Sequence, residues 1–156
     1  MDRIRRLLAQ QPIFTAFDPG WLDLIHPITR LARFATGSRL LCAGDAAEQF
    51  FLLTEGAVGL QTMVPSEDGP RPVAIGTLAA GDLLGASWLL PSRQWRYDAM
   101  AMNDVEALAI DADEFLVLCE REHRLGYRVM QALGQVFARR LAETRLQTLD
   151  VYANWS

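Results

Sequence analysis

The sequence predicts a mainly β fold with flanking helices, an α+β arrangement in which a roll of short strands lies between helical segments. Short strand-like runs with glycine turns fill the middle of the chain, and helical periodicity appears on both sides of them. A length of 156 residues suits one domain with a substantial core. We therefore expect a single domain over 1–156, with N-terminal helices in 1–27, a β-roll in 28–110 and C-terminal helices in 111–152.

Two short helices are predicted before the roll. The first, RIRRLLAQQ, has its isoleucine and leucines at helical spacing, and Pro12 ends it because proline lacks a backbone N–H. The second begins at Asp18-Pro19, an N-cap residue followed by proline at the first helical position, and ends before Pro27.

Seven strand-like runs follow: ITRLARFA, SRLLCA, FFLLT, AVGLQTMV, PVAIGTLA, YDAMAM and VEALAI. The turn signals between them are Thr36-Gly37, Gly44-Asp45, Glu55-Gly56, Asp68-Gly69 and Gly81-Asp82. Many short strands at this spacing are typical of a sandwich or barrel.

Helical periodicity returns after the strands. Asp111 and Glu114 stand at capping-box spacing and predict a helix through Leu118. A longer helix is predicted from about Leu125 to Tyr152. Its apolar stripe consists of Val129, Met130, Leu133, Val136, Phe137 and Leu141.

The composition limits the classes of function. The net charge of −4 gives no general attraction to nucleic acid or to an anionic membrane. No apolar run reaches the roughly 20 residues of a membrane helix, and the N-terminus lacks the pattern of a signal peptide, so we expect a cytoplasmic protein. Cys42 and Cys119 match no metal or redox spacing and are expected to be buried structural thiols.

Four segments resemble the cyclic nucleotide-binding domain family in order and spacing: FATGSRLLCAGDAAEQFFLLTEGAVGL, GTLAAGDLLGASWLL, the strand with Asp98-Ala99, and ALAIDADEFLVL. The resemblance runs roughly from Leu31 to Leu118. It implies a double-stranded β-helix jelly roll with a ligand pocket around Gly85. There a short helix N-terminus and backbone N–H groups would cradle a cyclic phosphate.

The side chains of this loop depart from the family pattern. Ala86 stands where the family has a glutamate for the ribose hydroxyl, and losing that partner costs about 1.5–3 kcal/mol. Anchoring the alignment on Ala99 puts Tyr97 at the position of the phosphate-binding arginine and Asp98 at that of a serine or threonine. Anchoring it on Gly85 gives the arginine role to Arg96. Both alignments fit the residues.

Four further residues bear on the pocket. Ser87 either offers a hydroxyl near the missing carboxylate or caps the turn. Trp88 and Trp95 either stack on a planar ligand, with Trp88 as a candidate base contact, or fill the space of a phosphosugar. In catabolite activator protein, a member of the family, a threonine three positions beyond ARRL approaches the purine. Thr144 is the corresponding residue in ARRLAET.

Two other classes of function are disfavoured. A cupin-like metal enzyme needs several histidine and carboxylate ligands from the strands, but the chain has only His26 and His123, so we expect no metal and no catalytic residues. A DNA-binding regulator needs a helix-turn-helix after the long helix, where only about DVYANWS follows, so we expect no nucleic-acid partner.

The sequence thus predicts a stand-alone sensor domain with weak or altered binding of a cyclic nucleotide or related small ligand, and no other cofactor. We expect a homodimer through the long helix, with Val129, Leu133, Val136 and Phe137 at the contact, and an unidentified protein partner. The alternative is a ligand-independent dimerisation and partner-docking module.

Overall fold

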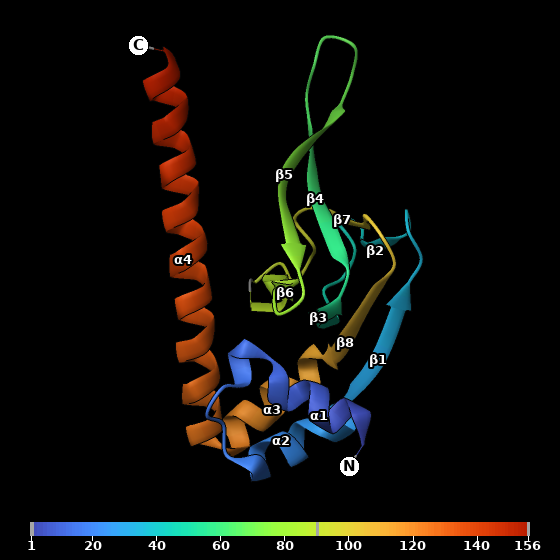
Figure 1. The fold of residues 1–156 in the computed structure, drawn as a ribbon, viewed down its shortest axis with the longest axis vertical. Helices are drawn as coiled ribbons and strands as arrows, with labels where there is room; N and C mark the ends of the chain where they lie inside the picture. Colours follow the sequence, from blue (N-terminus) through green and yellow to red (C-terminus); the bar gives the residue numbers. More distant parts are fainter. Residues whose placement is uncertain (1, 90, 156) are drawn as a thin grey trace.

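Two four-stranded antiparallel sheets form the centre of the molecule in the computed structural model (Figure 1). The structure describes residues 2–89 and 91–155, with side chains of the last helix through Glu143. The strand orders are β1-β8-β3-β6 and β2-β7-β4-β5. The strands are β1 (Thr29–Phe34), β2 (Arg39–Leu41), β3 (Gln49–Glu55), β4 (Ala57–Val64), β5 (Arg71–Ala79), β6 (Leu83–Leu84), β7 (Asp98–Ala101) and β8 (Val105–Asp111). This arrangement confirms the predicted jelly roll with flanking helices.

The seven predicted runs coincide with every strand except β6. That strand has only two residues, which pair with Phe51 and Leu52 of β3. Two residues are too few to show a period, although both leucines of β6 are buried. Strands β4 and β5 extend as a hairpin beyond the rest of the roll (Figure 1).

The N-terminal segment forms α1 (Arg3–Gln10), η1 (Pro12–Phe14), α2 (Pro19–Ile25) and η2 (His26–Ile28). The cap predicted at Asp18 is confirmed, since its carboxylate accepts a 2.8 Å hydrogen bond from the Gly20 N–H. Asp2 caps α1 in the same way through the Ile4 N–H at 2.8 Å.

A buried carboxylate holds α1 on the first sheet. Glu106 of β8 is 4% exposed, and it pairs with Arg3 at 2.9 Å and Arg33 at 3.5 Å and accepts from the Thr54 hydroxyl at 2.8 Å. Burial raises the pKa of Glu106, but the Thr54 hydrogen bond and the two arginines outweigh it and leave the pKa below its usual value. The carboxylate therefore stays charged and fixes the helix to the sheet at neutral pH.

An aromatic cluster joins the helices to the roll. Phe115 of α3 (Ala112–Arg121) lies 5.1 Å from Phe50 of β3 and 6.5 Å from Phe14 of η1, measured between ring centroids. All three rings are at most 2% exposed. The N-terminal helices, the first sheet and α3 consequently share one core.

The C-terminal part begins with α3, and the predicted cap is present because the Asp111 carboxylate accepts from the Glu114 N–H at 2.9 Å. Helix α4 (His123–Trp155) crosses α3 at Gly126, where an added Cβ would lie 2.6 Å from the Cys119 carbonyl oxygen. It then runs alongside the roll (Figure 1). Among the described residues, no helix combines the length and apolarity needed to cross a membrane.

Both cysteines are unpaired and only partly buried, so the expectation of buried thiols is wrong. Burial, with a smaller contribution from Glu120, raises the pKa of Cys119 to about 11. Its reactive thiolate is therefore scarce at neutral pH.

Candidate functional site

The predicted phosphate-binding loop lies between β6 and β7. Gly85 follows β6 with φ of +91°, in the left-handed region that favours glycine, and Ala86–Leu89 form the short helix η3. The turn before β6 is closed by Asp82, whose carboxylate accepts a 2.8 Å hydrogen bond from the Ala79 N–H.

The Trp95 side chain covers Gly85. A Cβ added to Gly85 would lie 2.8 Å from the nearest atom of the Trp95 ring, and the tryptophan is only 7% exposed. Main-chain bonds of 2.9 Å hold Trp95 there, because its N–H donates to the Asp45 carbonyl and its carbonyl accepts from Gly44. The ring thus fills space next to Gly85 rather than lying open to a planar ligand.

Tyr97, and not Arg96, faces the loop. Burial raises the pKa of Tyr97, while the charge of Arg140 and a hydrogen bond from the Gly85 backbone N–H lower it. Arg96 is exposed. The Tyr97 side chain thus lies close to the Gly85 backbone, at the strand end of the loop.

Asp98 and Ala99 stabilise the second sheet and the segment beside it. Asp98 is 7% exposed, and its carboxylate accepts a 2.7 Å hydrogen bond from the Ala43 N–H. Ala99 is fully buried and pairs with Leu41 of β2 and Leu60 of β4. The Asp98 carboxylate thus fixes the segment that follows β2.

Trp88 is not a base contact, which corrects the prediction. Its ring is 2% exposed and stacks on Phe50 with the centroids 5.1 Å apart and the planes at 22°. It lies in the core because it points from η3 toward β3 and α3. Ser87 is also buried, and Ala86 packs partly buried on the core. The side chain of Thr144, the other candidate base contact, lies outside the described residues.

The assignment of Val129 and Leu133 to a dimer contact is wrong. Both are at most 2% exposed because they pack against the molecule's own core, and Val136 is partly buried beside the roll. Only Phe137 of the predicted contact is exposed, at 39%. Among the side chains of α4 described through Glu143, the exposed large apolar ones are Tyr127, Met130, Phe137 and Leu141.

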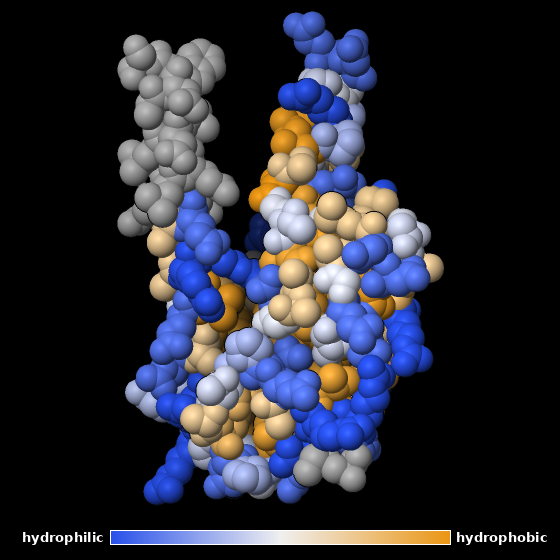
Figure 2. Space-filling model, viewed as in Figure 1, coloured by the Kyte–Doolittle hydropathy of each residue, from blue (hydrophilic) through white to orange (hydrophobic). Residues whose placement is uncertain are grey.

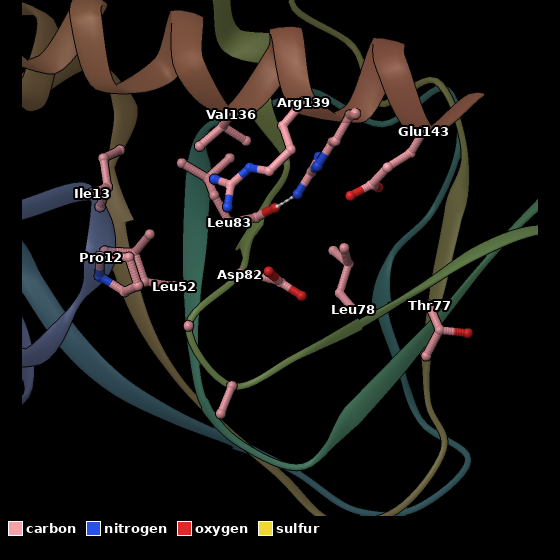
Figure 3. A pocket seen from close by; sticks show the side chains of 13 residues that line it. Pro12, Ile13, Leu52, Thr77, Leu78, Asp82, Leu83, Val136, Arg139 and Glu143 are labelled. Carbon is pink, nitrogen blue, oxygen red and sulfur yellow. Dashed lines mark hydrogen bonds between the residues drawn. The ribbon is translucent and has the colours of Figure 1, made fainter. Parts of the chain in front are cut away.

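The cavity shown in Figure 3 lies beside the loop, and neither Gly85 nor Tyr97 lines it. It has a volume of about 320 Å³ and lies between α4 and the turn that precedes β6. Its charged side chains are Asp82, Arg139, Arg140 and Glu143. No sequence motif marks these four residues as a site, because Arg139, Arg140 and Glu143 look like the solvent-facing charges of a helix and Asp82 like a turn residue.

Comparison with known proteins identifies the family of the fold. Residues 31–122 match the family model for the cyclic nucleotide-binding domain. The chain is 26% identical over 136 residues to the cyclic AMP receptor protein of Thermus thermophilus, covering 87% of this chain and 60% of that protein. It is 29% identical over 136 residues to glutaminase 1 of Bradyrhizobium diazoefficiens, covering 86% of this chain and 21% of that protein.

The chain therefore spans less than two thirds of the length of these two relatives. Among solved structures, a cyclic nucleotide-binding domain from Methylobacillus flagellatus superposes with a TM-score of 0.77 at 18% identity, covering 94% of this chain and 80% of that one. At 18% identity, this similarity shows a shared fold and nothing more.

Replacing Gly85 with alanine tests the contact with Trp95. Gly44 is the matched control, because its φ is +93° but an added Cβ would meet nothing within 4 Å. Gly44→Ala should lower the free energy of unfolding by about 1–2 kcal/mol through its backbone alone. Gly85→Ala should lower it by roughly 1–3 kcal/mol more through overpacking.

Urea denaturation of both variants measures the difference. When Trp95→Leu is also present, Gly85→Ala should cost less unfolding free energy than it does in the unmodified chain, because the ring that its Cβ would meet is absent. Equal losses for the two glycine variants in the unmodified chain would contradict the packing described here.

Proposed function

The chain belongs to the cyclic nucleotide-binding domain family, and we propose that it is a regulatory domain of this family with a modified ligand site. It would bind a cyclic nucleotide or related small ligand weakly. The observation that carries this proposal is the Trp95 ring packed against Gly85. A phosphate could enter the loop only after this ring and the Tyr97 hydroxyl had moved away.

The energetics support weak binding. Ala86 offers no acceptor for a ribose hydroxyl, a loss of about 1.5–3 kcal/mol that corresponds to roughly ten- to hundredfold in affinity. Moving the buried Trp95 adds the cost of exposing a large aromatic surface. Tyr97 carries no charge to pair with a phosphate, and the neighbouring Arg96 is exposed.

We propose further that α4 forms a symmetric pair. Tyr127, Met130, Gly134, Phe137 and Leu141 follow one another at alternating spacings of three and four, the pattern of a two-helix seam. The four apolar side chains among them are 39–69% exposed. A second α4 packed on this face would bury them, and each helix would present the same face to the other.

A ligand-independent dimerisation and partner-docking module is the second candidate. The packing of Trp95 also favours this candidate, because a loop whose space is filled by a side chain of the protein needs no ligand to complete its packing. Under this candidate the seam on α4 would form whether or not a nucleotide is present. Ligand titration and oligomeric state together separate the two candidates.

The proposed role is regulatory rather than catalytic. His26 lies in η2 with its ring nitrogen 2.8 Å from the Asp2 carboxylate, and His123 begins α4. Both histidines therefore lie outside the strands from which a cupin-like site draws its ligands.

Calorimetric titration with cyclic AMP and cyclic GMP tests the ligand site. We expect the unmodified protein to bind neither with submicromolar affinity. Ala86→Glu combined with Tyr97→Arg and Trp95→Leu should strengthen binding at least tenfold, since it supplies both polar partners and clears the ring. The control combines Ala86→Leu, Tyr97→Met and Trp95→Leu, which clears the ring without adding charge. Submicromolar binding by the unmodified protein, or equal binding by both triple variants, would refute the account of the site.

Sedimentation at micromolar concentration tests the α4 seam. The unmodified protein should be a dimer, and Phe137→Asp should make it monomeric by placing a charge in the apolar contact. Gln135→Asp is the control, because this exposed residue lies on a different face of α4 and should leave the dimer intact. A monomer before mutation, or the same response from both variants, would exclude the seam.

A further inference from the structure

The cavity between α4 and the turn before β6 combines an apolar floor with opposite charges. Leu52, Leu78 and Val136 line it together with Arg139 and Glu143 of α4 (Figure 3). Figure 2 shows the corresponding hollow between α4 and the roll, where hydrophobic and hydrophilic surface meet. Its volume of about 320 Å³ suits a small molecule.

Arg139 and Glu143 of α4 point into this cavity instead of pairing with each other. Arg139 and Glu143 are four residues apart, a spacing at which opposite charges on a helix commonly pair. Neither makes an ion pair or hydrogen bond within the described part of the chain. Both side chains instead reach from α4 toward the strands (Figure 3).

Two further groups complete the charged lining. Asp82 faces α4 across the cavity, and only its Oδ2 atom is engaged, by the Ala79 N–H at 2.8 Å. Arg140 has a different role, because its guanidinium donates to the Leu83 carbonyl at 2.7 Å and so forms part of the wall. The cavity thus offers one guanidinium and two carboxylates that a ligand can reach.

We propose that this cavity binds a free α-amino acid with an apolar side chain. The planar guanidinium of Arg139 matches the ligand carboxylate, which it can bind through two parallel hydrogen bonds. The ligand ammonium group would lie between Asp82 and Glu143. The apolar side chain would then rest on Leu52 and Val136, where it is removed from water.

The charge of the cavity favours a zwitterion over a simple ion. The two arginines and two carboxylates of the lining sum to zero formal charge, so a ligand with one charge of each sign leaves the site balanced. A cyclic nucleotide, a net anion, would meet both carboxylates without supplying a cation for them. The cavity is also separate from the loop at Gly85, because neither Gly85 nor Tyr97 lines it. Binding of an amino acid there would be a function in addition to the one proposed above.

Calorimetric titration with L-leucine and L-methionine tests the proposal. The unmodified protein should bind both, and N-acetyl-leucine and leucine amide, each lacking one charge, should bind at least tenfold more weakly. Arg139→Gln should weaken leucine binding at least tenfold. Arg121→Gln is the control, because it removes the same charge from an exposed residue at the end of α3, outside the cavity.

Absence of amino-acid binding at millimolar ligand, equal binding of the blocked analogues, or equal weakening by the control variant would each overturn the proposal. The thermal midpoint of Arg139→Gln should match that of the unmodified protein, since Arg139 is exposed and unpaired within the described chain. The cyclic AMP titration of Arg139→Gln should also be unchanged. The amino-acid titration thus tests the proposal for the cavity, and the cyclic AMP titration tests the proposal for the Gly85 loop, independently of each other.

Discussion

The contact between the Trp95 ring and the backbone of Gly85 is the constraint on which the ligand site depends. Gly85 can adopt its φ of +91° without strain, and the absence of a side chain lets the ring approach. Main-chain bonds to Gly44 and Asp45 hold the tryptophan in this place. The Trp95 ring fills the space next to Gly85, and the Tyr97 side chain lies close to the same backbone.

The same loop is tied to the helices on two sides. Trp88 stacks on Phe50 and approaches Phe115 of α3, so η3 cannot shift without disturbing the aromatic core. Arg140 of α4 binds the Leu83 carbonyl of β6 and lies near Tyr97. A ligand that displaced the side chains next to Gly85 would therefore act on both α3 and α4. The geometry suits a regulatory domain because occupancy of the loop and position of the helices are physically coupled.

Turn and cap chemistry made most of the fold predictable. The glycine turns, the Asp18 and Asp111 caps and the strand periods are local signals, and local sequence reports them directly. Local sequence does not reveal which tryptophan faces the loop. Trp88 and Trp95 are equally apolar, and their different positions arise only from tertiary packing. The same holds for α4, where Val129 and Phe137 read alike but one is buried and the other exposed. The charged cavity depends on a helix meeting a turn more than 50 residues earlier, a proximity that no local pattern encodes.

The most direct measurement is the backbone amide signal of Gly85 in a nuclear magnetic resonance titration with cyclic AMP. This N–H reports the place where a phosphate would bind, and in the structure it already faces Tyr97. The account predicts that the signal stays in place at micromolar nucleotide, and that it moves when Tyr97→Phe removes the hydroxyl. A large shift at micromolar cyclic AMP, saturating at one nucleotide per chain, would show that the loop accepts a phosphate readily and would contradict the account.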